Sequence, residues 1–398
     1  YSGTAQTFNF GQDSSFAGNK TAQGNQDGND IGDFYYTPPT GFLALCTSNL
    51  PDVAVTPSEH FNVVTYSGTG SEQAIVTGFK PDLVWIKARD YTYSHLLVDT
   101  VRNWTGSGQA REIRTNTTGN EVNRSNSVKE DFNANGFSVI SDAAYNSSSY
   151  NYVSWNWKAN GSGSSNTNGD ITSTVNASVD AGFSIVGYTG TGATNKTVGH
   201  GLSSAPEMLM IKNRTDDSYN WYVYHHESHE SYAYNRGLYL NDTSALVASS
   251  AFFGATPTSS VFTIAGSGAQ HTNISSKDYI AYCFHSVDGY SKVGSYTGNG
   301  NADGTFVYTG FRPAYVMWKR TDSSGSSWGI VDSARNTYNV MGQTLYPDLS
   351  NAENTNNYCD FTANGFKIRG TSGFQNASGG TYIFLAFAET PFKYSNAR

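Results

Sequence analysis

The sequence is poor in charge, in cysteine and in long apolar runs. Only 14% of its 398 residues are charged, and the net charge at pH 7 is -8. A nucleic-acid partner would need clustered Lys and Arg, so the composition argues against one. No apolar stretch approaches the roughly 18 residues of a membrane helix, and no signal peptide is visible. Three scattered cysteines, Cys46, Cys283 and Cys359, form no CxxC pair and favour idle thiols over a disulfide framework or a zinc site.

Aromatic residues, glycine and small polar residues are abundant instead. Tyr occurs 27 times and Gly 41 times. Aromatic and β-branched side chains favour pleated strands, and glycine favours tight turns. No segment shows sustained helical periodicity. Apolar runs flank Asn135-Gly136 and Asn364-Gly365, a pattern typical of hairpins with a type I′ turn. We therefore predict an all-β fold.

One motif occurs three times along the chain. It begins at Tyr66, Tyr188 and Tyr296, reads Tyr-x-Gly-x-Gly, and is followed each time by a glycine, a proline and an apolar strand. The copies start 122 and 108 residues apart, which is too long for a solenoid repeat of up to about 50 residues and right for a small domain. Each copy is therefore predicted to be an antiparallel β-sandwich of jelly-roll or lectin-like type.

The motif spacing and the composition divide the chain into five predicted segments. These are an N-terminal unit (1–56), repeat 1 (57–160), a flexible linker rich in Gly, Ser and Asn (161–169), repeat 2 (170–288) and repeat 3 (289–398). Repeats 2 and 3 join with almost no linker, so we expect them to lie rigidly against each other. A protein made of three copies of one domain usually repeats the same binding surface in each copy. It is less often built around a single catalytic pocket.

Two parts of the sequence resemble modules of bacteriophage appendage proteins. The N-terminal unit, with Phe8-Asn9-Phe10-Gly11 and Gly32-Asp33-Phe34-Tyr35-Tyr36, is similar to the closing half of SPRY-like domains in tail fibres and other appendages, especially of marine phages. Repeat 3, with Gly310-Phe311-Arg312-Pro313 and Ala386-Phe387-Ala388-Glu389, is similar to a module common in the same proteins. A SPRY-like sandwich would be half complete here. Either upstream sequence is missing, as the lack of an initiator Met also indicates, or the N-terminal unit packs on the repeats.

The resemblance implies a virion protein, in a tail fibre, spike or capsid fibre, that is assembled in the host cytoplasm and exposed outside the cell. It implies other virion proteins as partners and a homo-oligomer, with a trimer as one form. Loops rich in Tyr, Ser, Asn and Gly suit adhesion to host-surface glycans because they offer rigid contact area and adaptable hydrogen bonds, and repetition adds avidity. Two alternatives stay open: a purely structural decoration or adaptor protein, and a polysaccharide depolymerase.

Two charged motifs could form sites, and each also has a structural interpretation. The pair Asp99 and Arg102 recurs as Asp332 and Arg335, and a local ion pair after a strand is favoured over a ligand grip. In repeat 2 the aligned stretch is the histidine cluster 225–229. There His225 and His229, four residues apart as on one face of a helix, could bind zinc. That region should follow a strand, so surface histidines that titrate near neutrality are favoured.

Two further candidates concern calcium and sugar. The loop from Asn25 through Asp27 to Asp33 offers alternating oxygen ligands but lacks the closing Glu of an EF-hand, and Asx-turns explain its composition equally well. Trp104 lies in a polar loop and could stack on a sugar ring, whereas Trp221 and Trp328 recur in register and should be core. We assign no catalytic, cofactor-binding or metal-binding residue and expect no cofactor.

Overall fold

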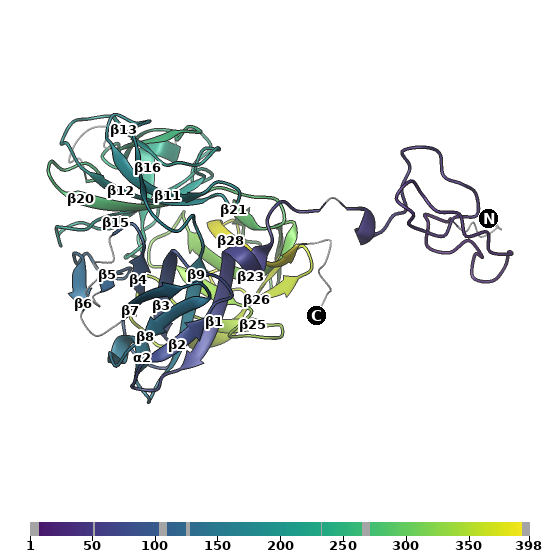
Figure 1. The fold of residues 1–398 in the computed structure, drawn as a ribbon, viewed down its shortest axis with the longest axis horizontal. Helices are drawn as coiled ribbons and strands as arrows, with labels where there is room; N and C mark the ends of the chain where they lie inside the picture. Colours follow the sequence, from purple (N-terminus) through teal and green to yellow (C-terminus); the bar gives the residue numbers. More distant parts are fainter. Residues whose placement is uncertain are drawn as a thin grey trace.

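The computed structural model describes residues 8–50, 52–102, 110–124, 128–231, 233–264 and 271–391. Antiparallel strands dominate these ranges, which confirms the all-β prediction, and the helices within them are single turns. No helix in the described ranges is long and apolar enough to cross a membrane. Figure 1 shows a body that holds the three repeats and a lobe, residues 8–50, that lies apart from it.

Repeat 1 consists of two facing sheets. Its strands are β1 (Phe61–Ser67), β2 (Gln73–Val76), β3 (Leu83–Ala88), β4 (Leu96–Asp99), β5 (Ala110–Arg114), β6 (Val122–Arg124), β7 (Val128–Asn133), β8 (Gly136–Val139) and β9 (Asn151–Trp157). The main sheet has the order β1-β9-β3-β4-β5-β6, and the second sheet has the order β2-β8-β7. The one-turn helices α1 (Pro57–His60) and α2 (Ala143–Asn146) precede β1 and β9.

Repeat 2 has the largest sheet. Its strands are β10 (Ser164–Asn166), β11 (Ser173–Ser178), β12 (Phe183–Thr189), β13 (Lys196–Gly199), β14 (Met208–Asn213), β15 (Trp221–His225), β16 (Arg236–Tyr239), β17 (Val247–Ala248), β18 (Phe253–Ala255), β19 (Val261–Ile264) and β20 (Asp278–Phe284), with a 3-10 turn, η2 (Ala233–Asn235). The main sheet runs β10-β11-β12-β20-β14-β15-β16-β17, and β13-β19-β18 face it.

The segment predicted as a flexible linker, 161–169, is part of this sheet. It contains β10, which pairs with β11 from Ser164 opposite Val175 to Asn166 opposite Ser173. Serine, asparagine and glycine are common in linkers, but their backbone groups pair as well as any others when a neighbouring strand is available. Repeat 2 therefore continues from repeat 1 through an ordered strand.

Repeat 3 has a smaller main sheet than repeats 1 and 2. Its strands are β21 (Ser291–Thr297), β22 (Asp303–Tyr308), β23 (Phe311–Arg320), β24 (Gly329–Asp332), β25 (Met341–Thr344), β26 (Asn354–Thr362), β27 (Gly365–Arg369) and β28 (Thr381–Pro391). The sheet orders are β21-β28-β23-β24 and β22-β27-β26-β25. The run Tyr382–Phe387 is apolar on both faces, as expected of a central strand. It lies in β28 between two neighbours and is buried throughout.

The two predicted Asn-Gly hairpins exist, but their turns lie one residue earlier. Asn133 pairs with Gly136, and Thr362 pairs with Gly365, so Asn135 and Asn364 occupy the second turn position. Neither asparagine has a positive φ, so the turns are not of type I′. The glycines are needed in the strands instead: a Cβ on Gly136 would lie 1.9 Å from the Ile75 carbonyl oxygen.

The repeated Tyr-x-Gly-x-Gly segment holds a turn at the same place in each repeat. In repeat 2, Tyr188 stacks on Tyr279 with ring centroids 5.0 Å apart, and Thr191 N donates to Asn273 Oδ1 at 2.8 Å. A Cβ on Gly190 would lie 2.2 Å from the Ile274 carbonyl oxygen. Tyr66 with Tyr152 and Asn146, and Tyr296 with Tyr382 and Asn376, form the same arrangement in the other repeats. The repeated Tyr-x-Gly-x-Gly motif therefore has a structural role, because it fixes a turn against a neighbouring strand and loop.

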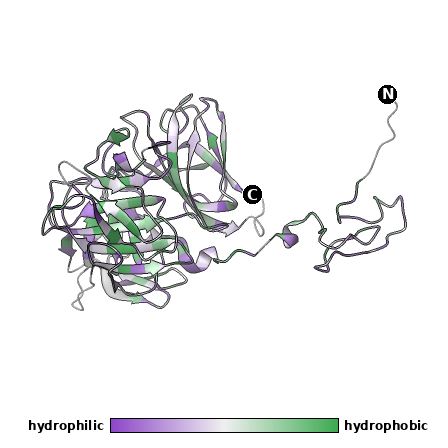
Figure 2. Cartoon of the chain, turned by 90° about the horizontal axis from the view of Figure 1, so that it is seen from above, coloured by the Kyte–Doolittle hydropathy of each residue, from purple (hydrophilic) through white to green (hydrophobic). Residues whose placement is uncertain are grey.

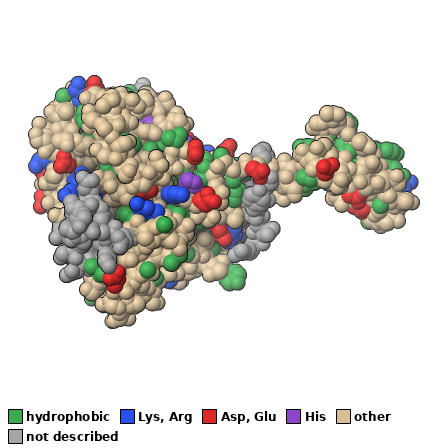
Figure 3. All heavy atoms as spheres, viewed as in Figure 1, with side chains coloured by type: hydrophobic (Ala, Val, Ile, Leu, Met, Phe, Trp, Pro, Cys, Tyr) green, Lys and Arg blue, Asp and Glu red, His purple; other side chains and the backbone are tan. Residues whose placement is uncertain are grey.

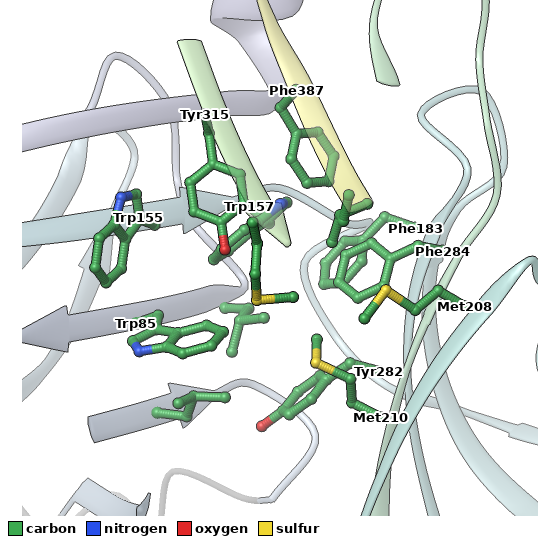
Figure 4. Close-up of a cluster of buried hydrophobic side chains, with 14 of the residues drawn as sticks. Trp85, Trp155, Trp157, Phe183, Met208, Met210, Tyr282, Phe284, Tyr315 and Phe387 are labelled. Atoms are coloured by element: carbon green, nitrogen blue, oxygen red, sulfur yellow. The ribbon is translucent and has the colours of Figure 1, made fainter. Parts of the chain in front are cut away.

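The three repeats share one central core in addition to a core of their own. Each sandwich encloses a separate apolar cluster, and a fourth cluster joins the inner faces of all three main sheets. Figure 4 shows Trp157 of repeat 1 among Phe284 of repeat 2 and Tyr315 and Phe387 of repeat 3. The green strands in the body of Figure 2 show the same concentration of apolar residues. The three repeats therefore form one packed body rather than three independent domains in a row.

Equivalent backbone groups close this body into a ring with approximate threefold symmetry. Repeat 1 donates a hydrogen bond to repeat 2, repeat 2 donates to repeat 3, and repeat 3 donates to repeat 1. The three bonds run from Glu121 N to Arg214 O (2.9 Å), from Leu246 N to Thr321 O (2.9 Å) and from Glu353 N to Arg89 O (2.6 Å). Every repeat therefore has two neighbours, and repeats 1 and 3 meet directly.

The N-terminal lobe is held by turns and side-chain hydrogen bonds. Its described residues contain one isolated bridge, Asn25 with Phe34, and a 3-10 turn, η1 (Thr47–Asn49). Several large apolar side chains are exposed there, including Phe8, Tyr36 and Leu45, and Figure 3 shows apolar side chains on the lobe surface. Figures 1 and 2 place residues 8–50 away from the repeats, whereas the end of the N-terminal unit packs on them, with Val55 in the central core and Val53 against Gly289.

Candidate functional site

The two recurring Asp–Arg pairs are buried ion pairs after a strand, as the favoured interpretation predicted. Arg102 Nε lies 2.5 Å from Asp99 Oδ2, and Arg335 Nε lies 2.6 Å from Asp332 Oδ2, with all four side chains fully buried. Each aspartate also receives a donor from the next repeat. Tyr282 Oη donates to Asp99 at 2.7 Å, and Trp155 Nε1 donates to Asp332 at 3.0 Å. The pairs join repeats and offer no access to a ligand.

His225 takes the place of the aspartate in repeat 2. It is the last residue of β15 and is 1% exposed, so the expectation of a surface histidine that titrates near neutrality is wrong for it. Its Nδ1 accepts from Glu227 N at 3.2 Å. Burial, helped by the neighbouring His226, lowers the pKa of His225 to about 3. It therefore remains a neutral part of the core at physiological pH.

The histidine cluster does not form a metal site in this structure. His225 lies in a strand and His229 in the turn that follows, where His229 Nδ1 accepts from Ser231 N at 3.3 Å. The helical spacing that would align the two rings is absent from this segment. Across the described ranges, no group of three His, Cys, Asp or Glu side chains is placed to hold a metal ion.

Three buried histidines should make the protein sensitive to mild acid. Burial lowers the pKa of His225 to about 3, that of His200 to about 4 and that of His95 well below its ordinary value. Below pH 6.5 the unfolded chain binds protons that the folded chain does not. We expect the free energy of unfolding to fall by up to about 1.4 kcal/mol per histidine for each pH unit below about 6. Urea denaturation between pH 7.5 and 4.5 measures this slope.

A matched variant separates the histidines from the carboxylates. His225→Gln should reduce the slope, because it removes one of the histidines whose pKa is lowered in the folded chain, a group that also includes the partly buried His60 and His271. Unfolding free energies that stay constant down to pH 4.5 would contradict the assignment of neutral buried histidines.

Asp27, the central carboxylate of the calcium candidate in the lobe, is already satisfied by protein donors. Asp27 Oδ1 accepts from Asn29 N and Ile31 N, and Asp27 Oδ2 accepts from Ala44 N and Asn49 Nδ2, all within 3.1 Å. Burial acts to raise the pKa of Asp27, but these hydrogen bonds outweigh it and lower the pKa to about 2. The Asx-turn interpretation explains the loop without an ion.

The recurring tryptophans belong to the interfaces between repeats. Trp221 Nε1 donates to Arg114 O of repeat 1, and Trp328 Nε1 donates to Tyr239 O of repeat 2, both at 2.8 Å. His95 holds the equivalent place in repeat 1 and accepts from Trp85 Nε1 at 2.9 Å. These residues are core, as predicted. Trp104, the candidate for sugar stacking, lies outside the described residues.

Repeat 3 contains a groove with a volume of about 1010 Å³ at its contact with repeat 1. Its walls carry hydroxyl and amide side chains from the segments 323–327 and 351–356 and from Thr92 of repeat 1. Tyr346 and Phe374 form an aromatic floor with ring centroids 5.6 Å apart. Such a combination of flat rings and adaptable hydrogen-bonding groups suits a polar ligand with apolar faces.

The charged side chains at the groove are already paired. Arg320 Nε lies 2.9 Å from Asp322 Oδ1, and Glu353 lies 3.0 Å from Arg89 and 3.1 Å from Arg335. Glu353 is the one carboxylate among the described residues that line the groove. A ligand in the groove would therefore contact polar hydroxyl and amide groups, while the charged side chains are already neutralised by their partners.

Residues 56–391 match a family described as a domain of unknown function, DUF7483. The chain belongs to this family. The DUF7483 match begins where the lobe ends and spans all three repeats, which agrees with their shared core. No curated protein matches the sequence.

The DUF7483 body also contains a group of residues that the sequence patterns missed. Lys87, Lys212 and Lys319 hold equivalent places in β3, β14 and β23 and are fully buried. Lys212 Nζ donates to Thr118 O of repeat 1 at 2.8 Å, and Lys319 Nζ donates to Thr243 O of repeat 2 at 3.3 Å. Burial lowers their pKa values to about 7, 8 and 8. The available signal was their recurrence at one strand position in all three copies.

Proposed function

We propose that the chain is a structural appendage protein of a bacteriophage virion, in a tail fibre, spike or capsid fibre, and that it adheres to a host-surface glycan through the groove of repeat 3. The observation that carries the adhesive role is a polar groove whose charged side chains are paired and whose lining includes the rings of Tyr346 and Phe374. Sugar rings present apolar faces and hydroxyl edges, which match aromatic rings and amide or hydroxyl side chains respectively.

The rigid closed body also supports a role in display. A side chain that projects from a packed body keeps its orientation, so little conformational entropy is lost when a ligand binds. The groove spans the contact between repeats 1 and 3, because Thr92 lies in one wall and Ser324 in another. Its shape therefore depends on the assembled body rather than on one repeat.

The groove predicts a specific loss of binding. Tyr346→Ala should weaken binding to host polysaccharide at least about tenfold, because it removes half of the aromatic floor. Titration of host cells or an immobilised glycan array with labelled protein measures the affinity. Tyr338→Ala is the matched control, because Tyr338 is 73% exposed and lies outside the groove. Equal affinity of both variants with the native chain would contradict the groove as the site.

Two further observations test the wider proposal. Labelled antibodies against the chain should decorate an appendage of intact virions; a protein found only in infected cells would contradict the virion assignment. Incubation with host polysaccharide should release no reducing ends, because a glycosidase needs two carboxylates and the described lining of the groove offers Glu353 alone. Virion attachment without glycan binding would instead favour a decoration or adaptor protein.

A further inference from the structure

The three main sheets contain equivalent strands, β1, β12 and β21, which pair with β9, β20 and β28. In repeat 2 the other edge of this strand is covered, because β11 pairs with β12 from Ser173 opposite Tyr188 to Ser178 opposite Phe183. In repeat 1, β1 is the outermost strand of its sheet. The burial patterns agree: all but the last residue of β12 is buried, whereas β1 is half-buried with Thr65 and Ser67 exposed.

The free edge of β1 has its hydrogen-bonding groups directed outward. Gly68 N donates to Tyr150 O, and Lys158 N donates to His60 O, so the even-numbered residues face β9. The odd-numbered Val63 and Thr65 therefore point their peptide groups away from the sheet. Within the described ranges, these peptide groups have no hydrogen-bond partner. An edge of this kind is a template for another strand.

Beside this edge lies a glycine that a side chain of β11 covers in repeat 2. There, Val175 packs over Gly201, and its Cγ1 would lie 2.7 Å from a Cβ on that glycine. The equivalent glycine of repeat 1 is Gly78, with a similar φ of +88°. A Cβ there would have Ser58 O, at 4.0 Å, as its nearest neighbour. The space over Gly78 is therefore uncovered, and Gly78 is exposed.

In repeat 3 the same edge is blocked by a side chain of repeat 2, Ser286, and by one of repeat 3, Tyr308. Ser286 Oγ accepts from Val293 N at 3.0 Å, which occupies an outward peptide group of β21. The Tyr308 hydroxyl would lie 3.5 Å from a Cβ on Gly310, the glycine equivalent to Gly78. The three repeats thus show a covered edge, a blocked edge and an open edge.

We propose that the β1 edge of repeat 1 binds an extended segment of a partner protein by antiparallel strand addition. The segment resembles β11 in its chemistry: a β-branched apolar residue fits over Gly78, and small polar residues flank it, as Thr174 and Asn176 flank Val175. Backbone hydrogen bonds to Val63 and Thr65 provide affinity, and the contact of a side chain with Gly78 provides specificity. The site is separate from the groove of repeat 3 and does not depend on glycan binding.

A labelled peptide with the sequence of residues 171–179 tests this proposal against the full chain. Fluorescence anisotropy should show saturable binding with one peptide per chain. Thr65→Pro removes an outward N–H that the fold does not use, and proline is tolerated at such edge positions. This variant should bind the peptide at least about tenfold more weakly. Thr65→Ala keeps the N–H and should bind within threefold of the native chain.

Modified peptides give a second readout that does not depend on folding of the variant. N-methylation at the position of Asn176 blocks an amide that faces the edge strand in the β11 pairing, whereas N-methylation at the position of Val175 alters the opposite edge. The first peptide should lose binding and the second should keep it. Absence of saturable binding at millimolar peptide, or equal binding of the two modified peptides, would overturn the proposal.

Discussion

Replacing Trp157 with alanine is expected to lower the free energy of unfolding by about 4 kcal/mol. The Trp157 ring lies 5.1 Å from Phe61 of its own repeat, 6.4 Å from Phe284 of repeat 2 and 5.7 Å from Phe387 of repeat 3, measured between ring centroids. The side chain is 1% exposed, so its removal leaves a cavity at the contact of all three sheets.

The central position of Trp157 makes the form of the unfolding transition informative. Because the cavity would weaken every repeat, we expect one cooperative transition in urea, shifted as a whole to lower denaturant. Far-ultraviolet circular dichroism and hydrogen exchange in each repeat should report the same loss. Two separate transitions, with repeats 2 and 3 at native stability, would show that the repeats behave as independent domains.

Two control variants define the origin of the effect. Trp157→Phe keeps an aromatic ring and removes an indole N–H that has no partner within the described residues, so we expect a smaller loss of about 1–2 kcal/mol. Tyr338→Ala changes an exposed ring of similar size and should stay within about 0.5 kcal/mol of the native chain.

Asp332→Ala is expected to cost about 3–5 kcal/mol, a large effect for one carboxylate. The change leaves the fully buried Arg335 guanidinium without the partner that lies 2.6 Å away, and it removes the acceptor of the Trp155 indole. Glu353 and the Ile330 carbonyl remain close to Arg335 and compensate in part. Chemical denaturation at pH 7.5 measures the loss.

A surface pair and a double replacement provide the comparison. Asp322→Ala breaks a pair with Arg320 in which the side chains are 37% and 19% exposed, and it should cost at most about 1 kcal/mol. Asp332→Leu combined with Arg335→Met removes both buried charges and should be markedly more stable than Asp332→Ala. A double variant no more stable than the single one would show that the charge left behind is not the cause.

The sequence predicted the strands well because a strand is a local structure. The alternation in Tyr152–Trp157 and the two-faced apolar run in Tyr382–Phe387 both correspond to strands, β9 and β28. The same pattern cannot reveal which element covers a buried face. The alternation puts Ser154 and Asn156 on the other face of β9 from Trp155, where polar residues suggest solvent, yet both are fully buried. The sequence therefore did not predict the core that the three repeats share, although it did predict strands that form it.

The sites were less predictable because they depend on contacts between repeats. The Asp332–Arg335 pair could be recognised as a local ion pair, but its partner Trp155 lies 177 positions away in the sequence. Lysine is usually a surface residue, but Lys212 is buried. Its ammonium group donates to backbone carbonyl oxygens, which no side-chain pattern in the sequence reveals. The groove of repeat 3 combines loops whose residues are common everywhere in this chain.

The ring of hydrogen bonds from repeat to repeat has a consequence for how such a chain can evolve. An open array lengthens when a unit is duplicated, because its last unit always has a free end. Here the third unit already bonds back to the first through Glu353 and Arg89. A fourth copy would find no place in the circle, so gene duplication can add a new ring but cannot enlarge this one.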